Sequence, residues 1–194
     1  MLDEAVAALE RGEVVVLPTE TVYGLAARVD RLSAIEKIFE LKGRDTEKVL
    51  QVLVPDASWL ERLGEPSAAC RALARAFWPG PLTLIIRARA DTPTAVIKDG
   101  GVGIRVPDNA ATLAVLRDAG AVAASSANRS GESTPDNIDA IRTIFGDGVA
   151  VYLDGEMIAG SGSTVVDMTT DEPKLVREGP LPFDRVKSVV AESI

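Results

Sequence analysis

Residues 17–25, with the sequence LPTETVYGL, concentrate groups that can bind a ligand. Thr19, Thr21 and Tyr23 carry hydroxyl groups, and a carboxylate stands between the two threonines. The apolar run before them predicts a buried strand at residues 13–17, which a proline ends because it has no N–H for the ladder. Open α/β sheets bind ligands at the carboxyl ends of their strands. The segment is therefore predicted to be a binding loop, with a simple polar turn as the alternative.

Two cations, Lys42 and Arg44, are separated by a glycine at the end of a predicted helix. Lysine supplies a point charge and arginine a planar fork of donors, and both suit phosphate groups. Cations at a helix C-terminus also interact favourably with the helix dipole. Phosphate binding and helix capping both stay open as interpretations of this pair.

Arg105 stands between apolar residues in a predicted strand at residues 102–106. A buried guanidinium group needs a carboxylate partner, from the protein or from a ligand. The neighbouring Gly101 and Gly103 do not form a dinucleotide-binding fingerprint, because no third glycine opens a helix. Arg105 is thus expected either in an internal ion pair or in a site for a carboxylate ligand.

Two further loops carry hydroxyl groups at the ends of predicted strands. One of them holds Ser125, Ser126, Asn128 and Thr134 after an apolar strand at residues 121–124. Hydroxyl, carboxamide and backbone N–H groups can together form a nest for an anion. The same residue types also make ordinary local turns.

The other loop is glycine- and serine-rich and leads into the sequence STVVD at residues 163–167. It places Ser163 at the mouth of a predicted strand, and Arg177 ends the strand that follows. Ser163 and Arg177 are therefore candidates for binding, with a plain loop as the alternative.

The chain contains no histidine and one cysteine, Cys70. A Ser-His-Asp or Cys-His mechanism is excluded on this ground, as are an internal disulfide and a cysteine-based zinc site. No Gly-x-x-x-x-Gly-Lys-Ser/Thr segment occurs, so a bound nucleotide would be held by dispersed cations and hydroxyl groups. Cys70 is expected to be a buried structural thiol.

The 194 residues are 46% hydrophobic and 26% charged, the balance of a soluble globular protein. No apolar run approaches the length of a membrane span, and the acidic N-terminus lacks the basic flank of a signal peptide. We therefore expect a cytoplasmic protein that does not contact a membrane. The net charge of −8 argues against tight binding of a nucleic-acid backbone.

These side chains must be positioned by an α/β fold. Several predicted strands follow one another without a helix between them, which indicates a mixed sheet with flanking helices in one domain over residues 1–194. Periodicity and glycine or proline breaks predict helices at residues 2–9, 32–43, 66–77, 110–119, 136–145 and near the C-terminus, and strands at residues 13–17, 25–29, 50–54, 82–87, 102–106, 121–124, 149–153, 164–167 and 174–177.

In their order along the chain, these motifs resemble the YrdC/TsaC family of threonylcarbamoyl-AMP synthases. The resemblance covers about residues 3–180, and Asp45 departs from it by standing where many members have proline. The matching segments are PTETVYGL at 18–25, KGR at 42–44, WPGPLT at 78–83, RVP at 105–107, SSAN at 125–128 with SG at 130–131, STVVD at 163–167, and the pair Arg177 and Gly179.

The resemblance implies a single YrdC-like domain, a twisted sheet with a concave ligand-binding face, and a reaction. In that reaction L-threonine, bicarbonate and ATP give threonylcarbamoyl-AMP and pyrophosphate, and no protein nucleophile is required. Orientation and neutralisation of phosphate charge would carry the catalysis. Matched by motif, the ATP-binding residues would be Lys42, Arg44, Ser126, Asn128, Thr134 and Arg177, and the threonine-binding residues Thr19, Thr21, Tyr23, Arg105, Ser125 and Ser163.

The resemblance also implies Mg²⁺ as the companion of ATP, although no ligand set can be read from the sequence. It implies a downstream machinery, of the TsaD/TsaB/TsaE type, that transfers the threonylcarbamoyl group to tRNA, and weak tRNA binding by the protein itself. Two alternatives remain: an RNA-binding or ribosome-maturation factor that uses the same concave face, and ATP-dependent carbamoyl transfer to another acceptor.

Overall fold

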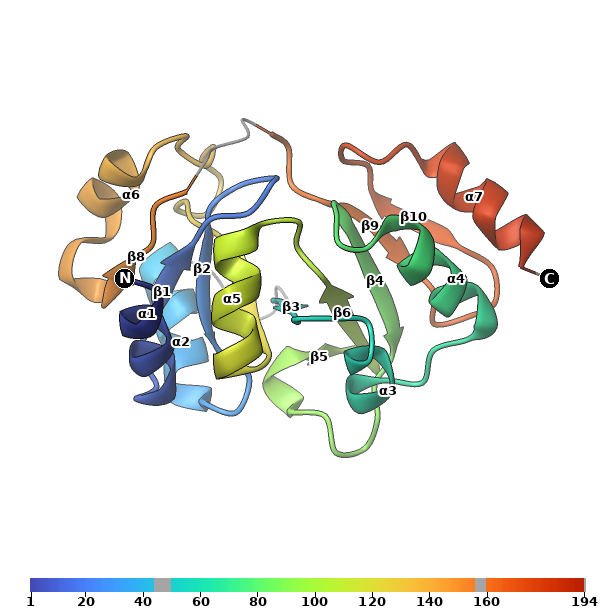
Figure 1. Ribbon diagram of the computed structural model, residues 1–194, viewed down its shortest axis with the longest axis horizontal. Coiled ribbons are helices and arrows are strands. Elements are labelled where there is room, and N and C mark those ends of the chain that lie inside the picture. The colour runs from blue at the N-terminus through green and yellow to red at the C-terminus, as the bar shows by residue number, and fades with distance from the viewer. Residues whose placement is uncertain (44–49, 156–159, 194) are drawn as a thin grey trace.

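The computed structural model describes residues 1–43, 50–155 and 160–193 (Figure 1). Within these ranges ten strands form one sheet, in the order β10-β9-β4-β6-β3-β7-β2-β1-β8, with β5 paired to β6. The strands are β1 (Val15–Leu17), β2 (Gly24–Arg28), β3 (Gln51–Leu53), β4 (Leu82–Arg87), β5 (Ile97–Lys98), β6 (Gly101–Arg105), β7 (Val122–Ser126), β8 (Val151–Tyr152), β9 (Thr164–Asp167) and β10 (Lys174–Arg177).

Helices stand between some of these strands along the chain, whereas β1 and β2, β5 and β6, and β9 and β10 follow one another directly. They are α1 (Leu2–Glu10), α2 (Leu32–Lys42), α3 (Trp59–Leu63), α4 (Ala68–Phe77), α5 (Ala110–Ala119), α6 (Ile138–Phe145) and α7 (Phe183–Glu192), with short 3-10 turns η1 (Thr94–Val96) and η2 (Gly146–Gly148). In the sheet β1 and β8, β3 and β6, and β4 and β9 pair in parallel, while the other pairs are antiparallel. The predicted mixed α/β sheet is confirmed.

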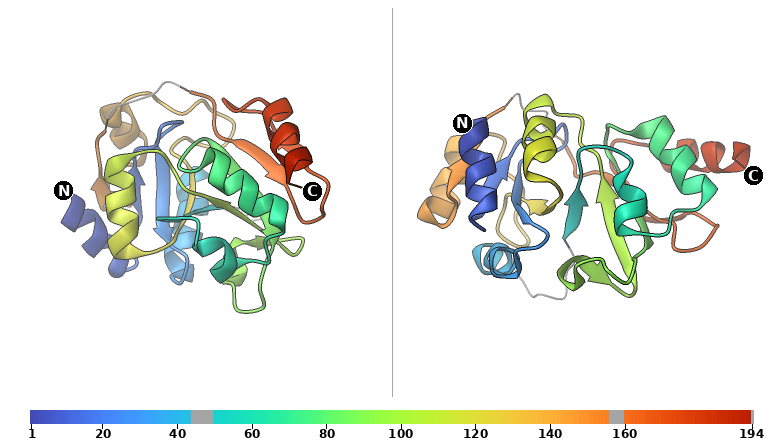
Figure 2. Two further views of the ribbon diagram at one scale, coloured as in Figure 1. Left: turned by 45° about the vertical axis from the view of Figure 1, so that its right-hand side comes forward. Right: turned by 60° about the horizontal axis from the view of Figure 1, so that its bottom comes forward.

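The half of the sheet that contains β7, β2, β1 and β8 is covered on both faces. Helices α1 and α5 lie side by side over one face of this half of the sheet, as Figures 1 and 2 show. Their apolar residues, Leu9 and Leu116 among them, form a core with Val15 and Leu17 of β1. Helix α2 packs against β2 on the other side of the sheet. Since successive strand residues point to opposite faces, Val16 and its neighbours on that side join a second core.

The half of the sheet that contains β6, β4, β9 and β10 is covered on one face. Helix α4 packs on β4, and α7 packs on α4 (Figure 2). In β6 the alternate residues Val102 and Ile104 belong to the core beneath these helices. Gly101, Gly103 and Arg105 occupy the opposite face of the strand, because side chains alternate, and they line a cavity there. The helices thus leave one sheet face accessible for a site.

Local caps move two predicted helix boundaries. The hydroxyl group of Ser67 accepts a bond from the Cys70 N–H at 3.2 Å, so α4 begins at Ala68 rather than at residue 66. In the same way Asn137 caps α6 by accepting from the Ala140 N–H at 2.8 Å. Cys70 is fully buried, as predicted. The short elements α3 and β5 were not predicted.

None of the helices in the part of the chain that the structure describes is long and apolar enough to cross a bilayer.

Gly179 is expected to be essential for packing around β9. A Cβ atom built on it would lie 2.6 Å from the backbone carbon of Ser163 and 2.6 Å from the Thr164 nitrogen. Gly179→Ala should therefore lower the free energy of unfolding by about 1–3 kcal/mol, measured by urea denaturation. Gly103→Ala is the control: its nearest contact would be the Thr83 methyl group at 3.5 Å. Equal stability of the two variants would contradict this assignment.

Candidate functional site

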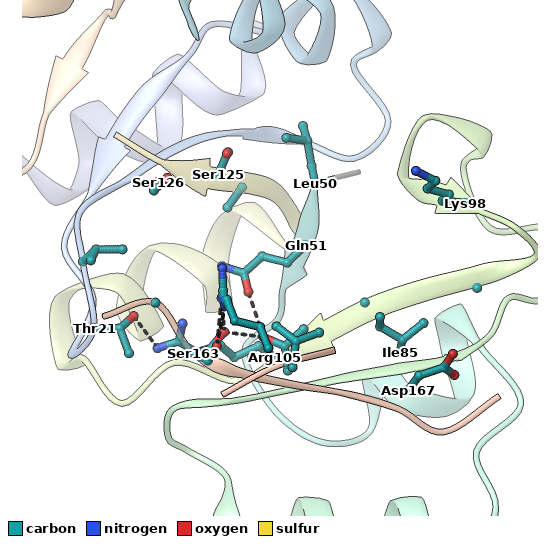
Figure 3. A pocket seen from close by; sticks show the side chains of 18 of the residues that line it. Thr21, Leu50, Gln51, Ile85, Lys98, Arg105, Ser125, Ser126, Ser163 and Asp167 are labelled. Atoms are coloured by element: carbon teal, nitrogen blue, oxygen red, sulfur yellow. Dashed lines mark hydrogen bonds between the residues drawn. The ribbon is translucent and has the colours of Figure 1, made fainter. Parts of the chain in front are cut away.

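The exposed sheet face holds a cavity of about 510 Å³. It crosses the middle of the sheet, from β7 through β3, β6 and β4 to β9 (Figure 3). Its lining residues are Thr21, Val22, Leu50, Gln51, Thr83, Ile85, Lys98, Asp99, Gly101, Gly103, Arg105, Ala124, Ser125, Ser126, Gly162, Ser163, Val165, Asp167, Thr169 and Arg177.

Arg105, at the end of β6, places a charged side chain in this wall with only 1% of its surface exposed. Its Nη2 lies 2.7 Å from Oε1 of Glu20 and donates to the Thr21 hydroxyl group at 2.9 Å, while Nε donates to the Gly80 carbonyl at 3.1 Å. Burial lowers the pKa of Arg105, and the Glu20 carboxylate opposes that shift. The internal ion pair is thus present, while the side chain still faces the cavity.

Glu20 is incompletely satisfied by this ion pair. Both of its carboxylate oxygens are buried, and neither accepts a hydrogen bond of regular geometry from any residue in the described ranges. The 2.7 Å contact with Arg105 is therefore mainly electrostatic. The Glu20 carboxylate therefore compensates the charge of Arg105 but leaves N–H groups of the guanidinium available to another acceptor.

The loop after β1 is held by a directed set of hydrogen bonds. Thr19 donates its hydroxyl hydrogen to the Val22 carbonyl at 2.5 Å. The 2.9 Å contact between the hydroxyl groups of Thr19 and Thr21 must then use the hydrogen of Thr21. Arg105 donates to Thr21, so the bonds run from the guanidinium to Thr21, to Thr19 and to a carbonyl. Thr19 shapes the loop, and Thr21 lines the cavity.

A second series of hydrogen bonds links side chains at β10, β9, β4 and β3. Arg177 donates to the carbonyl of Ser163 from Nε at 3.0 Å and from Nη2 at 2.8 Å, and Nη2 also lies 3.3 Å from the Ser163 hydroxyl oxygen. The hydroxyl groups of Ser163 and Thr83 are 2.7 Å apart, and Thr83 donates to Oε1 of Gln51 at 2.9 Å. These four residues are packed together along one wall.

Arg177 and Arg105 make this end of the cavity electropositive. Burial lowers the pKa of Arg177, and repulsion from Arg105 adds to that shift. Gly162 leaves room for the guanidinium group, since a Cβ there would lie 2.9 Å from Nη2 of Arg177. Two guanidinium groups on one cavity wall favour an anionic ligand there.

Ser125 and Ser126, the last two residues of β7, line the cavity, and the loop that follows them is held by hydrogen bonds on its far side. Asn128 donates to the carbonyls of Arg129 and Glu132, both at 2.8 Å, and accepts from Thr134 at 3.0 Å. The buried Lys42 ammonium donates to the carbonyl of Ser126 and, at 2.8 Å, to that of Asn128. Lys42, Asn128 and Thr134 therefore hold the loop in shape.

The interpretation of Tyr23 as a substrate-binding residue is not supported by its position. Its ring is buried in the core, and its hydroxyl group donates toward Asp154 Oδ1 at 2.8 Å and the Gly155 carbonyl at 3.0 Å. Burial raises the pKa of Tyr23 to about 12. Tyr23 ties the loop after β1 to the chain beyond β8 and does not line the cavity.

The structure therefore divides the predicted site residues into groups. Thr21, Arg105, Ser125, Ser126, Ser163 and Arg177 line one cavity, whereas Thr19, Tyr23, Lys42, Asn128 and Thr134 stand behind its walls. Arg44, like Asp45, lies outside the described residues.

Sequence reasoning missed several lining residues. Gln51, Thr83, Lys98 and Asp167 carry polar groups on the wall, and Figure 3 shows Lys98 and Asp167 at the end away from Arg105. Thr83 and Asp167 belong to the matched motifs, and their alternation with core residues in β4 and β9 could have revealed them. Nothing local distinguishes Gln51 from any polar residue in a short strand.

The chemistry open to this site is the binding and orientation of anions. Within the described residues no group of three or more acidic or cysteine side chains is placed to hold a metal ion. The cavity instead offers two guanidinium groups and a series of hydroxyl groups. Such a surface suits carboxylate and phosphate groups.

Comparison with known proteins links this chain to one family. The profile of the Sua5/YciO/YrdC family, described as "Telomere recombination", matches residues 7–179. A protein of Mycobacterium tuberculosis is 39% identical over 191 residues, covering 96% of this chain and 87% of its own length. The threonylcarbamoyl-AMP synthase of Bacillus subtilis is 37% identical over 192 residues, again with 96% of this chain. This chain spans 56% of the length of the Bacillus protein.

The fold is also similar to that of a solved structure, the Sua5 protein of P. abyssi complexed with L-threonine. The TM-score is 0.91 at 33% sequence identity, and the match covers 98% of this chain and 57% of the other. The likeness extends over the whole sheet and therefore over the cavity.

Removing the Tyr23 hydroxyl group is expected to loosen the site. Tyr23→Phe should cost about 0.5–1.5 kcal/mol in the free energy of unfolding, because it deletes the bond to Asp154 and Gly155. Tyr152→Phe is the matched control, since that hydroxyl group donates to the Gly146 carbonyl at 2.7 Å, away from the cavity. Ligand affinity should fall only in the Tyr23 variant, and an unchanged affinity there would remove the positioning role.

Proposed function

The chain belongs to the Sua5/YciO/YrdC family, and from this premise we propose that it is a threonylcarbamoyl-AMP synthase. The reaction joins L-threonine, bicarbonate and ATP to give threonylcarbamoyl-AMP and pyrophosphate. The observation that carries the proposal is the cavity wall formed by Arg105, Arg177, Ser163 and Thr21. It supplies charge and donors for the carboxylate of an amino acid beside a row of serines for a nucleotide.

The amino acid would bind at the Arg105 end. Arg105 is held by Glu20, Thr21 and Gly80 through Nε and Nη2, and its wall position directs the guanidinium group at a ligand carboxylate. A planar fork is well matched to a carboxylate. Thr21 and Ser163 contact the same region, whereas Thr19 and Tyr23 keep the loop in place. The similar P. abyssi protein was solved in complex with L-threonine, which supports threonine as the amino acid.

ATP would lie toward the β7 end. Ser125 and Ser126 line that part of the cavity, and Lys42, Asn128 and Thr134 hold the loop that follows them in shape. Arg177 lies at the Arg105 end of the cavity, so its positive charge would meet the phosphate groups of a nucleotide that extends from the two serines toward Arg105. Arg44 is proposed as a further phosphate ligand from its motif alone. The residues thus extend from an amino-acid end to a nucleotide end along one wall.

The chemistry needs no protein nucleophile. The amine of threonine forms a C–N bond with the carbon of bicarbonate, and water leaves, which yields a carbamate. A carbamate oxygen then forms a bond to the α-phosphorus of ATP while the bond to the pyrophosphate oxygen breaks. The protein's part is to align these groups and to neutralise their charge.

Mg²⁺ is proposed to enter with ATP. Magnesium sites of this kind use one or two carboxylates together with substrate phosphates and water, and Asp99 and Asp167 are the carboxylates that line the cavity within the described residues. When bound, the ion would neutralise phosphate charge.

The product has to be consumed by transfer of its threonylcarbamoyl group. We propose that a tRNA-modifying machinery in the cytoplasm performs this step, as the resemblance implies. An RNA-binding role for the protein itself has weaker support, because the net charge of −8 opposes tight binding of a phosphate backbone.

The direct test is pyrophosphate release from ATP and Mg²⁺, with the nucleotide product identified by mass. We expect release to require both L-threonine and bicarbonate, and the product to have the mass of threonylcarbamoyl-AMP. Release that proceeds equally with other amino acids, or without any, would redirect the proposal to another carbamoyl acceptor. A folded protein without any release would overturn the enzyme assignment.

Arg105 should determine the affinity for threonine. Because removing it alone would leave Glu20 as an uncompensated buried charge, the variant to use is the double substitution Arg105→Met with Glu20→Gln. Loss of a charge-assisted contact should raise the KM for threonine about 10- to 100-fold, with a much smaller change in the KM for ATP.

The control for this variant is Arg28→Met, which removes a guanidinium group from an exposed pair with Asp30. It should leave both KM values unchanged. An unaltered KM for threonine in the Arg105 double variant would show that Arg105 serves only the internal ion pair.

A further inference from the structure

A series of hydrogen bonds leads from Arg177 to Gln51, and Arg177 fixes which group donates and which accepts at each step. Arg177 can only donate, so the hydroxyl oxygen of Ser163 accepts from it at 3.3 Å. Thr83 gives its single hydroxyl hydrogen to Oε1 of Gln51 at 2.9 Å. The 2.7 Å contact between Ser163 and Thr83 must then use the hydrogen of Ser163. The series therefore starts at a guanidinium group and ends at a carbonyl acceptor.

This direction orients the amide of Gln51. A side-chain amide has one acceptor oxygen and two N–H donors on its nitrogen. Since Oε1 accepts from Thr83, Nε2 occupies the other branch of the amide and keeps both N–H groups for another partner. Gln51 is half-buried and lines the cavity. Gln51 thus brings a pair of neutral donors to the cavity wall.

The position of Gln51 lies between the two proposed ends of the site. It pairs with Ala124 of β7, next to Ser125 and Ser126, and its strand β3 pairs on the other side with β6, which ends at Arg105. Figure 3 shows its side chain reaching from β3 into the space between the two serines and the pair Ser163 and Arg105. The group joining an amino acid to a nucleotide would have to pass this point.

We propose that Gln51 is a substrate-binding residue whose side-chain amide donates to a carboxyl-type oxygen of the bound substrate. The inference rests on the proposed function. Two carboxyl groups share this chemistry: the one derived from bicarbonate, which bridges threonine and the α-phosphate as a carbamate, and the carboxylate of threonine itself. The place of Gln51 between the serines and Arg105 favours the bridging group.

Two substitutions separate this role from a purely structural one. Gln51→Glu keeps an oxygen that can accept from Thr83 and replaces the two N–H donors by a negatively charged oxygen. Gln51→Met keeps the approximate volume and removes every hydrogen bond. A residue that only accepts from Thr83 would tolerate glutamate better than methionine, whereas a donor to a carboxyl-type oxygen would tolerate methionine better than glutamate.

The expected order of kcat/KM is wild type, then Gln51→Met, then Gln51→Glu. In the methionine variant the KM for bicarbonate should rise about 5- to 10-fold, which corresponds to one neutral hydrogen bond, and the glutamate variant should lose at least a further factor of about 10 through charge repulsion. A rise confined to the KM for threonine would identify the amino-acid carboxylate as the partner. The reverse order of the two variants, or two unchanged KM values, would overturn the proposal.

A binding measurement supplies a second readout. Gln51 is the only glutamine in the sequence, so glutamine labelled with ¹⁵N in its side-chain amide gives the wild-type protein one NH₂ signal pair. We expect this pair to shift when threonine and bicarbonate are added together with a non-hydrolysable ATP analogue. A shift with threonine alone indicates the amino-acid carboxylate, and no shift under any condition contradicts the inference.

The order of these experiments separates a failure of the Gln51 role from a failure of the proposed function. A wild-type protein that forms threonylcarbamoyl-AMP while the Gln51 signals and KM values stay unchanged would remove only the role of Gln51. A folded wild-type protein that forms no such product would overturn the proposed function first. Thermal unfolding of each variant checks its folding. Tyr152→Phe, which removes a hydroxyl group away from the cavity, should retain the wild-type affinity for bicarbonate.

Discussion

A positive charge buried in the middle of a β-sheet has to be compensated, and much of this site is arranged around Arg105 for that reason. With 1% of its surface exposed, the guanidinium group would cost several kcal/mol if left alone. Glu20 supplies the opposite charge. The Thr21 hydroxyl group and the Gly80 carbonyl accept hydrogen bonds from the Arg105 guanidinium group. Two segments distant in the sequence, residues 20–21 and Gly80, are therefore held at the end of β6. The charge remains at the cavity wall, where an anionic ligand can use it.

The two guanidinium groups also impose a direction on the hydroxyl groups beside them. Arginine can only donate, so the bonds from Arg105 run through Thr21 and Thr19 to a carbonyl. Those from Arg177 run through Ser163 and Thr83 to Gln51. Each hydroxyl group in these series accepts from one side and donates to the other. Such networks hold polar side chains in one arrangement before a ligand arrives, which is the preorganisation that electrostatic catalysis requires.

Several residues whose side chains could bind a ligand do not line the cavity but hold its walls in place. Tyr23 ties its loop to Asp154, and Lys42 donates to the backbone carbonyls of Ser126 and Asn128. A polar loop at the end of a strand exposes backbone groups that must be satisfied. Side chains such as these satisfy them and thereby fix the loop. The motif residues therefore include both the contact surface and the supports that hold it.

The sequence alone determined the elements whose signals are local. Strand β4 and helix α5 have the predicted bounds, because apolar periodicity and flanking breaks mark them, and the hydroxyl-rich loops were found because strand ends precede them. The caps at Ser67 and Asn137, the short α3 and the two-residue β5 escaped prediction, since such brief segments carry little periodicity. Only the tertiary structure decided which polar residues meet. Gln51 and Thr83 are 32 positions apart, and Thr83 and Ser163 are 80 apart; they touch because β3, β6, β4 and β9 pair in that order, and the pairing order depends on the packing of the whole sheet rather than on any segment of it.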